Sequence, residues 1–355
     1  MRIAEVHVWR ENLALTRPYT IAYKTVDSVE NVFLTITLEN GMTGIGAAGP
    51  SYMVTGETVD DSAAAIKSVA ESVLRGEDIR YFQRLLRQCR QEMADRPAAM
   101  AAVDAALHDA FTRFLDIRLI DWLGQVHKAL PTSVTIGITS VEETQAQARE
   151  HVANGFRIIK LKTGRSVAED VEVFTKLRET VGPGIKIRID ANQGYQPADL
   201  IAFADATRHL DVEFFEQPFP PRQLELQLEL PPILRKACAA DEDLHHAGHA
   251  LTLAADPQPY GIFNIKLMKC GGVAEAQRIA MIAERRRLAV MWGCNDESRV
   301  SITAALHAAL ASPATRYLDL DGSLDLARDV VSGGFVIKDG LMYLTDAVGL
   351  GVKLL

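Results

Sequence analysis

The chain has 355 residues, of which 48% are hydrophobic and 24% are charged, and its formal net charge is −8. This profile is typical of a soluble globular protein, and the length predicts a large domain with a smaller one. The acidic balance gives no basis for expecting a nucleic-acid or membrane-surface partner. No run of about 18 apolar residues occurs, and Glu5 and Glu11 interrupt the first stretch, so we predict neither a membrane-spanning helix nor a signal peptide.

The cysteines are far apart in the sequence and form no C-x-x-C pair: Cys89, Cys238, Cys270 and Cys294. Scattered cysteines of this kind are typical of reduced thiols in a cytoplasmic protein. We therefore expect a cytoplasmic location. The sequence leaves the oligomeric state open, a homo-oligomer included.

Residues 1–125 predict an α+β unit. Strands are expected at 3–9 and 29–38, and a turn at 39–42 leads to a third strand near Gly44. Loops are expected at 17–28 and 49–56. Three helices follow at 57–75, 78–93 and 95–114, the last with Asp95 as its N-cap and Pro97 in its first turn. The glycines of the hairpin do not form a phosphate-binding loop, because no helix follows them directly.

From about residue 126 to 322 the pattern changes to alternating strands and helices. Five successive strand ends carry Lys162, Asp190, Glu216, Asp241 and Lys266, at spacings of 28, 26, 25 and 25 residues. One strand, one helix and two loops take about 25–30 residues in a βα unit. In a parallel barrel the functional groups sit at the C-terminal ends of the strands. We count eight strands, the last without a regular helix, and expect residues 323–355 to return to the N-terminal unit.

Two further polar residues share these strand ends. Lys160 lies on the same strand face as Lys162, and Asn192 follows Asp190 just after its strand stops. An acid after a strand is often only a turn former or a helix N-cap. Charged groups in register at five strand ends are poorly explained in that way, and they predict a shared site.

Three converging carboxylates repel one another unless a cation lies between them. Oxygen ligands without His or Cys favour Mg²⁺ or Mn²⁺ over zinc. Lys162 and Lys266 flank the carboxylate strands, and a lysine beside a divalent cation is usable as a base near neutral pH. A metal that binds a substrate carboxylate between two opposed bases is suited to removing the proton α to that carboxylate through an enolate.

The whole chain resembles the muconate-lactonising subgroup of the enolase superfamily. The resemblance implies an α/β fold with an α+β capping domain on a modified (β/α)₇β barrel. It implies Mg²⁺ held by Asp190, Glu216 and Asp241, with Lys162 serving the L face and Lys266 the D face of the reacting carbon. Five motifs carry it: Lys160-x-Lys162, Asp190-x-Asn192, Phe215-Glu-Gln-Pro218, Ala240-Asp-Glu242 and Ile265-Lys-Leu-Met-Lys-x-Gly-Gly272.

Within this subgroup, Asp319 and Asp321 resemble the paired aspartates with which dipeptide epimerases hold the substrate's ammonium group. The segment 19–28 resembles their first capping loop. The resemblance therefore implies epimerisation of L,L-dipeptides at the α-carbon of the C-terminal residue. o-Succinylbenzoate synthase, N-acyl amino acid racemase and a non-catalytic metal-binding scaffold stay open as alternatives, and the synthase would need only one lysine as base.

Side-chain specificity depends on the loops. Asp296 and Glu297 follow the seventh strand and, with the two aspartates after the eighth, predict an acidic rim that favours cationic dipeptides. Lys24 in the first loop points the other way, toward an L-Ala-D/L-Glu epimerase in which a lysine pairs with a substrate glutamate. We expect cationic dipeptides, with the glutamate substrate as the alternative.

Overall fold

The N-terminal part of the protein is built on a three-stranded antiparallel sheet. The computed structural model describes residues 1–21 and 24–355, and the side chains of 18–25 lie outside the described residues. The sheet has the order β1 (Ile3–Ile21), β2 (Lys24–Leu38) and β3 (Thr43–Ala48). The expected loop at 17–28 is wrong for most of its length, because Thr, Tyr and Val in this segment favour extended backbone. Strand pairing continues to Ile21 and Lys24.

The helices after this sheet correspond to the three expected ones with shifted ends. The first ends in a π-helical turn, and the long helix α4 has Arg96 rather than Asp95 as its N-cap. The elements are α1 (Tyr52–Thr55), α2 (Val59–Val69), η1 (Ala70–Leu74), η2 (Ile79–Tyr81), α3 (Phe82–Glu92), α4 (Pro97–Phe114) and α5 (Leu119–Leu123). α2 starts at a capping box in which Thr58 and Asp61 satisfy each other's backbone amides.

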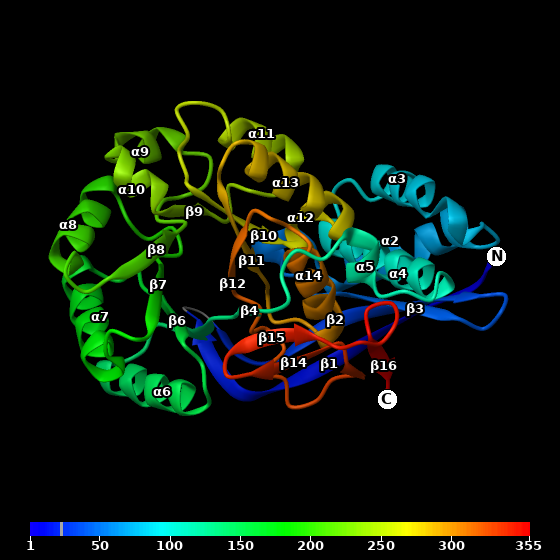
Figure 1. Ribbon diagram of the computed structural model, residues 1–355, viewed down its shortest axis with the longest axis horizontal. Coiled ribbons are helices and arrows are strands. Elements are labelled where there is room, and N and C mark those ends of the chain that lie inside the picture. The colour runs from blue at the N-terminus through cyan, green and yellow to red at the C-terminus, as the bar shows by residue number, and fades with distance from the viewer. Residues whose placement is uncertain (22–23) are drawn as a thin grey trace.

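The second part is an eight-stranded parallel sheet whose strands follow sequence order and curl around a central axis (Figure 1). The strands are β5 (Val134–Ile136), β6 (Ile158–Lys162), β7 (Lys186–Asp190), β8 (Val212–Glu216), β9 (Cys238–Ala240), β10 (Ile262–Lys266), β11 (Ala289–Gly293) and β12 (Thr315–Leu318). The connecting helices are α6 (Val141–Ala153), α7 (Val167–Val181), α8 (Pro197–Thr207), α9 (Leu224–Glu229), α10 (Pro232–Lys236), α11 (Ala247–Leu253), α12 (Leu267–Cys270), α13 (Val273–Arg285) and α14 (Arg299–Leu310). Within the described chain, no helix directly follows β12, which confirms the (β/α)₇β pattern.

The barrel closes through a short seam between its first and last strands. Thr132, just before β5, forms a parallel bridge with Leu318 at the end of β12. The Ser133 amide donates to the Leu318 carbonyl at 3.1 Å, and the Leu320 amide donates to Thr132 Oγ1 at 2.9 Å. Arg188, on β7 across the barrel, donates from Nη1 to the same Leu318 carbonyl at 2.6 Å.

The C-terminal segment forms β13 (Val331–Gly333), β14 (Phe335–Lys338), β15 (Leu341–Leu344) and β16 (Val352–Leu354), and β15 also pairs with β4 (Leu130–Pro131). It lies beside the N-terminal hairpin in Figure 1, where the Ala327 amide donates to the Ala14 carbonyl at 2.8 Å. The Leu119 amide likewise donates to the Gly349 carbonyl at 2.9 Å. These bonds join the first and last parts of the chain.

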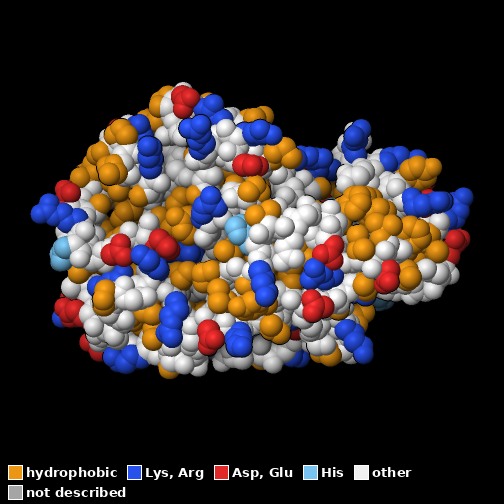
Figure 2. Space-filling view, viewed as in Figure 1, with side chains coloured by type: hydrophobic (Ala, Val, Ile, Leu, Met, Phe, Trp, Pro, Cys, Tyr) orange, Lys and Arg blue, Asp and Glu red, His pale blue; other side chains and the backbone are white. Residues whose placement is uncertain are grey.

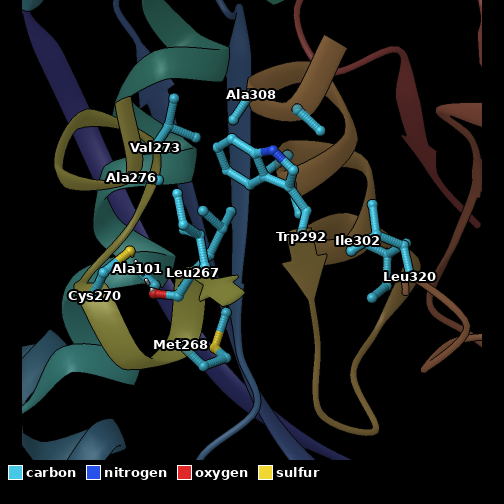
Figure 3. Close-up of a cluster of buried hydrophobic side chains, with 14 of the residues drawn as sticks. Ala101, Leu267, Met268, Cys270, Val273, Ala276, Trp292, Ile302, Ala308 and Leu320 are labelled. Atoms are coloured by element: carbon cyan, nitrogen blue, oxygen red, sulfur yellow. Dashed lines mark hydrogen bonds between the residues drawn. The ribbon is translucent and has the colours of Figure 1, made fainter. Parts of the chain in front are cut away.

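One buried apolar cluster runs through both parts of the protein. Figure 3 shows Trp292 and Leu320 of the barrel in this cluster together with Ala101 of α4 and Val273 of α13. Figure 2 shows Lys and Arg side chains interspersed with acidic ones over one face, without a continuous basic stripe. Among the described residues, no helix combines the length and apolar character needed to cross a membrane.

Helix α4 approaches the sheet closely because β3 carries glycine where it faces the helix. A Cβ at Gly46 would lie 1.9 Å from the Ala102 carbonyl oxygen, and one at Gly44 would lie 2.3 Å from the Ala110 nitrogen. Both contacts are closer than a side-chain carbon can make. The helix backbone therefore requires glycine at these two positions.

We expect Gly46→Ala to lower the free energy of unfolding by about 1–3 kcal/mol, the usual cost of overpacking a core. Urea denaturation measures this, and Gly184→Ala is the control because a Cβ there meets nothing within 4 Å. The control should stay within about 0.5 kcal/mol of the wild type. Equal effects of the two substitutions would contradict the close-approach explanation.

Candidate active site

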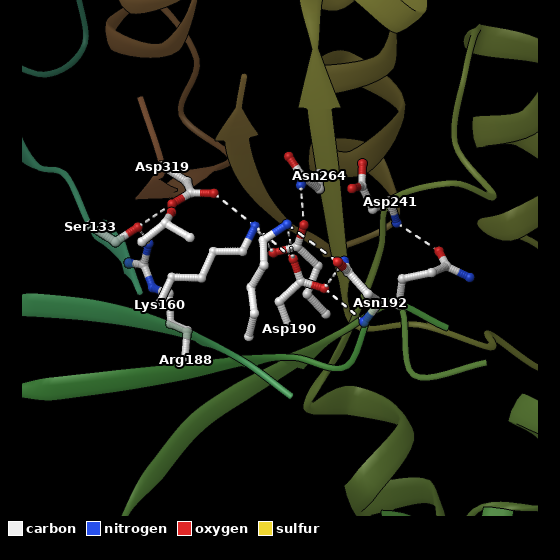
Figure 4. Close-up of polar contacts among 12 residues, drawn as sticks. Ser133, Lys160, Arg188, Asp190, Asn192, Asp241, Asn264 and Asp319 are labelled. Carbon is white, nitrogen blue, oxygen red and sulfur yellow. Dashed lines mark hydrogen bonds and ion pairs between the residues drawn. The ribbon is translucent and has the colours of Figure 1, made fainter. Parts of the chain in front are cut away.

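The charged residues predicted at the strand ends lie at one end of the barrel. Figure 4 shows two of them, Asp190 and Asp241, with the neighbouring Lys160 and Asn192. Lys162, Asp190 and Glu216 are the last residues of β6, β7 and β8, and the parallel register pairs each with the next. Lys266 ends β10, and Asp241 comes directly after β9. The carboxyl ends of parallel strands share one edge, so residues far apart in sequence converge there.

Lys160 lies at the centre of the carboxylates. Its Nζ is 3.1 Å from Asp190 Oδ2, 2.9 Å from Glu216 Oε2 and 3.0 Å from Asp319 Oδ2. Burial acts to lower the pKa of Lys160, but attraction to Asp190, Asp319 and Glu216 outweighs it and raises that pKa well above its usual value. Lys160 is therefore a fixed positive charge.

Lys162 lies on the more open side of the same group. Its side chain is 37% exposed, and its Nζ lies 3.9 Å from Asp190 Oδ2. Nζ also donates to Asn192 Oδ1 at 3.2 Å. Asn192 in turn donates from its amide and from Nδ2 to Asp190 Oδ1, at 3.0 and 2.7 Å. Asn192 thus orients both the carboxylate and the lysine, which leaves the Lys162 amine accessible.

Asp241 is held between two lysines of the next strand and helix. Lys266 Nζ lies 2.8 Å from Asp241 Oδ2, and Lys269 Nζ contacts Oδ1 and the Asp241 backbone oxygen. Burial acts to raise the pKa of Asp241, but Lys266 and Lys269 hold it well below its usual value. No role was expected for Lys269. The sequence feature that indicates Lys269 is the Lys-x-x-Lys spacing, which places it about one helical turn after Lys266 at the end of the strand.

Glu216 is the least neutralised of the three carboxylates. Asn264 donates from Nδ2 to Glu216 Oε1 at 2.8 Å, whereas Oε2 has the ion-pair distance to Lys160 but no hydrogen bond of suitable geometry. Burial raises the pKa of Glu216 to about 8 although Lys160 acts to lower it. Asn264 was not among the expected site residues. The feature that indicates it is its position two residues before Lys266, on the same face of the strand.

A divalent cation fits this donor set. Among the described residues no three acidic, His or Cys side chains are gathered into a metal cage, since Lys160 separates Asp190 and Glu216 while Asp241 contacts its two lysines. The three carboxylates are nevertheless buried, and Glu216 Oε2 has no hydrogen-bond donor. Hard oxygen ligands of this kind suit Mg²⁺.

The two aspartates after β12 have different surroundings. Asp319 is buried, and its oxygens accept from Lys160 Nζ and from Ser133 Oγ. Asp321 is half-buried, accepts from the Thr135 amide at 2.8 Å, and has its pKa raised to about 7 by burial and by Asp319. Asp319 therefore belongs to the lysine–carboxylate network, and Asp321 is the less neutralised of the pair.

The two residues expected on the rim after β11 differ in how far they are buried. Glu297 is only 3% exposed, accepts from the Asn295 amide at 2.7 Å, and has its pKa raised to about 7 by burial. Its carboxylate therefore faces the protein interior and does not form part of an open rim. Asp296 is half-buried. The Lys24 side chain lies outside the described residues.

The sequence and the fold of this chain are both similar to those of known proteins. The model for the mandelate racemase/muconate lactonizing enzyme N-terminal domain matches residues 3–124, and the enolase C-terminal domain-like model matches residues 143–355. An L-Lys-D/L-Arg epimerase of Desulforapulum autotrophicum is 51% identical over 353 residues and covers 99% of both chains.

Two solved structures have nearly the same fold. A Methylococcus capsulatus dipeptide epimerase complexed with Mg and L-Arg-D-Lys has a TM-score of 0.97 at 48% identity, covering 99% of both chains. A substrate-liganded L-Ala-D/L-Glu epimerase of Bacillus subtilis has a TM-score of 0.93 at 30% identity and the same coverage. The three relatives named above are all epimerases of dipeptides. The chain therefore belongs to the mandelate racemase/muconate lactonizing enzyme family of the enolase superfamily.

Proposed function

We propose that this protein is a Mg²⁺-dependent dipeptide epimerase that inverts the α-carbon of the C-terminal residue of L,L-dipeptides by 1,1-proton transfer. One observation carries the proposal: β6 with Lys162 and β10 with Lys266 flank the strands β7–β9 in the sheet, and the two lysines lie next to Asp190 and Asp241 respectively. An epimerase needs two bases, one for each face of the carbon. The dipeptide epimerases that match over the full chain support the assignment.

Each residue has a role in this proposal. Asp190, Glu216 and Asp241 would hold Mg²⁺, which when bound neutralises negative charge at the substrate carboxylate. Lys162 removes or returns the proton on one face and Lys266 on the other. Lys160, fixed among the carboxylates, adds a positive charge toward the substrate carboxylate, and Asn192 orients Lys162.

The other end of the substrate is bound by acids. Asp321 supplies a carboxylate for the substrate's ammonium group, with Asp319 behind it in the Lys160 network. A site that binds a carboxylate at one end and an amine at the other measures the length of a dipeptide. An elimination on a succinyl substrate would need neither aspartate, so the epimerase is favoured over o-succinylbenzoate synthase. N-acyl amino acid substrates lack the free amine that Asp321 would bind.

Cationic dipeptides are the proposed substrates. The relative at 51% identity acts on L-Lys-D/L-Arg, whereas the L-Ala-D/L-Glu epimerase is 30% identical. Asp296 lies in the loop after β11, at the C-terminal end of the barrel, and offers a charge complementary to Lys or Arg. Glu297 is turned inward and is not part of this proposal. The glutamate substrate, with Lys24 as its partner, is the alternative outcome of the tests below.

We also propose a domain organisation and a cellular location for the protein. Residues 1–125 form the capping domain, 126–322 the barrel, and 323–355 a segment that returns to the capping domain, supported by the hydrogen bond between Ala327 and Ala14. A cytoplasmic location is supported by the four cysteines, all of which are free thiols.

The metal assignment predicts the effect of neutralising each ligand. Asp190→Asn, Glu216→Gln and Asp241→Asn should each lower kcat/KM by roughly 100-fold or more, because even the hydrogen-bond partners of metal ligands contribute about 10–100-fold. Calorimetric titration with Mg²⁺ measures the affinity directly, with Glu225→Gln on the exposed face of α9 as the control. Full turnover after exhaustive chelation would contradict a metal-dependent reaction.

The two lysines predict a split between epimerisation and proton exchange. Lys266→Ala should stop epimerisation, yet the L,L-dipeptide should still take up deuterium at its α-carbon through Lys162. Lys162→Ala should show the reverse with the L,D-dipeptide. Mass spectrometry and NMR in D₂O follow both processes. Equal exchange of both epimers by both variants would rule out one base per face.

The specificity assignment predicts the result of a charge reversal. Asp296→Lys should lower kcat/KM for L-Arg-L-Lys by roughly tenfold, which corresponds to ~1.4 kcal/mol of lost ion pairing. A panel containing L-Ala-L-Glu and L-Leu-L-Tyr serves as the control, because these substrates should lose far less. A wild type that prefers L-Ala-L-Glu, and loses that preference in Lys24→Ala, would establish the alternative substrate.

A further inference from the structure

The two lysines that contact Asp241 lie at helix α12 and at the residue that caps it. Lys266 is its N-cap and Lys269 lies in its single turn, so Lys266 Nζ reaches Asp241 Oδ2 while Lys269 reaches Oδ1. Lys269 also contacts the backbone oxygens of Asp241 and Asn264. A shift of this one turn would therefore move Lys266 relative to the carboxylates.

Helices of the N-terminal part hold the far end of this turn. Arg90 of α3 donates from Nη1 to the Cys270 carbonyl at 3.2 Å and from Nη2 to the Gly271 carbonyl at 3.1 Å. These carbonyls lie at the C-terminal end of α12, where the helix leaves backbone acceptors without internal partners. The guanidinium of Arg90 satisfies two of them at once.

Asp104 of α4 holds the next residues. It is fully buried, and its Oδ1 accepts from the Val273 amide at 2.7 Å while Oδ2 accepts from the Ala274 amide at 3.2 Å. A Cβ at Gly272 would lie 2.4 Å from Asp104 Cβ, so glycine is required for this approach. Asp104 therefore caps α13 from another part of the chain and fixes the junction between α12 and α13.

Packing joins the same segments. α12 packs against α4, and Figure 3 shows Ala101 of α4 in one cluster with Leu267 and Cys270 of α12. Met268 accepts from the Gly49 amide through its Sδ at 3.2 Å, which adds a contact from the loop after β3. The contacts of Arg90, α4 and Gly49 thus reach α12 and its end from residues 1–125, and those of Asp104 reach the start of α13. Lys162 on β6 instead has its described polar contacts within the barrel.

We infer that Arg90 and Asp104 are positioning residues for Lys266, so that the N-terminal part of the chain sets the efficiency of one of the two proton transfers. This inference rests on the proposed function for its kinetic consequence. We call the contacts of Arg90 and Asp104 with residues 270–274 the clamp. Lys162 on β6 has its described polar contacts with Asp190 and Asn192 and does not depend on the clamp. Weakening the clamp should impair proton transfer by Lys266 and spare proton transfer by Lys162.

The test compares proton exchange on the two faces in the Mg²⁺-loaded enzyme. Deuterium uptake at the α-carbon without inversion is measured for two dipeptides. Uptake by L-Arg-D-Lys reports proton transfer by Lys266, and uptake by L-Arg-L-Lys reports proton transfer by Lys162. Asp104→Asn and the milder Arg90→Met should lower the ratio of the first rate to the second by roughly tenfold or more, since a displacement of about 1 Å can cost on the order of 100-fold.

Asp109→Asn is the matched control. Asp109 is a fully buried carboxylate on the same helix, but it accepts from the Ile45 and Leu350 amides and from Arg113, none of which belongs to α12. This variant should lose stability and keep the wild-type ratio. A ratio that is unchanged in Asp104→Asn and Arg90→Met, or that falls equally in Asp109→Asn, would overturn the inference.

Amide hydrogen exchange gives a readout that is independent of activity. Asp104→Asn and Arg90→Met should speed exchange in residues 267–274, and Asp109→Asn should speed it in β3 and near residue 350 instead. A wild type inactive on every dipeptide would overturn the proposed function, and the clamp would then be judged by amide exchange alone. Unchanged protection of residues 267–274 in both clamp variants would refute the clamp itself.

Discussion

The structure depends on the mutual neutralisation of buried lysines and carboxylates at the end of the barrel. An ionised side chain taken out of water without a partner costs several kcal/mol, and pairing offsets this cost only when the geometry is good. Lys160 contacts three carboxylates at once, and Asp241 contacts two lysines. Glu216 is the exception, since burial raises its pKa to about 8. The site is thus short of positive charge at the carboxylate best placed to gain from a bound cation.

The two parts of the protein depend on each other through helix α4. Glycines in β3 let this helix lie directly against the sheet, and its buried carboxylates reach in two directions. Asp109 binds β3 and the C-terminal segment, whereas Asp104 binds the start of α13 in the barrel. A carboxylate at a helix N-terminus is stabilised by the free amides and by the helix dipole. Through α4, the smaller part of the chain is therefore bonded both to its own sheet and to the start of a barrel helix.

In the proposed function, chemistry and specificity are carried by different structural elements. The groups proposed to bind the metal and move protons lie at strand ends, where the barrel's hydrogen bonding fixes the backbone. The residues that would choose between substrate side chains lie in loops such as the one after β11, which tolerate substitution. The Methylococcus capsulatus and Bacillus subtilis structures, at 48% and 30% identity, share the fold of this chain although their names give different dipeptides.

The sequence by itself determined the barrel, the order of its strands and the identity of the residues at their ends. Strand alternation and a repeat near 25 residues are local properties, and they were sufficient to bring Lys162, Asp190, Glu216, Asp241 and Lys266 together. They also indicated a strand pair at 3–9 and 29–38. They did not indicate that pairing extends to Ile21 and Lys24, because turn formers and β-formers are mixed in that segment.

Only the tertiary structure decided which side chain contacts which. Periodicity assigns a residue to a face, but it does not give the rotamer or the partner across the barrel. Lys160 and Asp319 are 159 residues apart, and the ion pair between them could not be read from the sequence. The contacts of Lys269, Arg90 and Asp104 likewise join distant segments, since a buried charge finds its partner through packing rather than through sequence spacing.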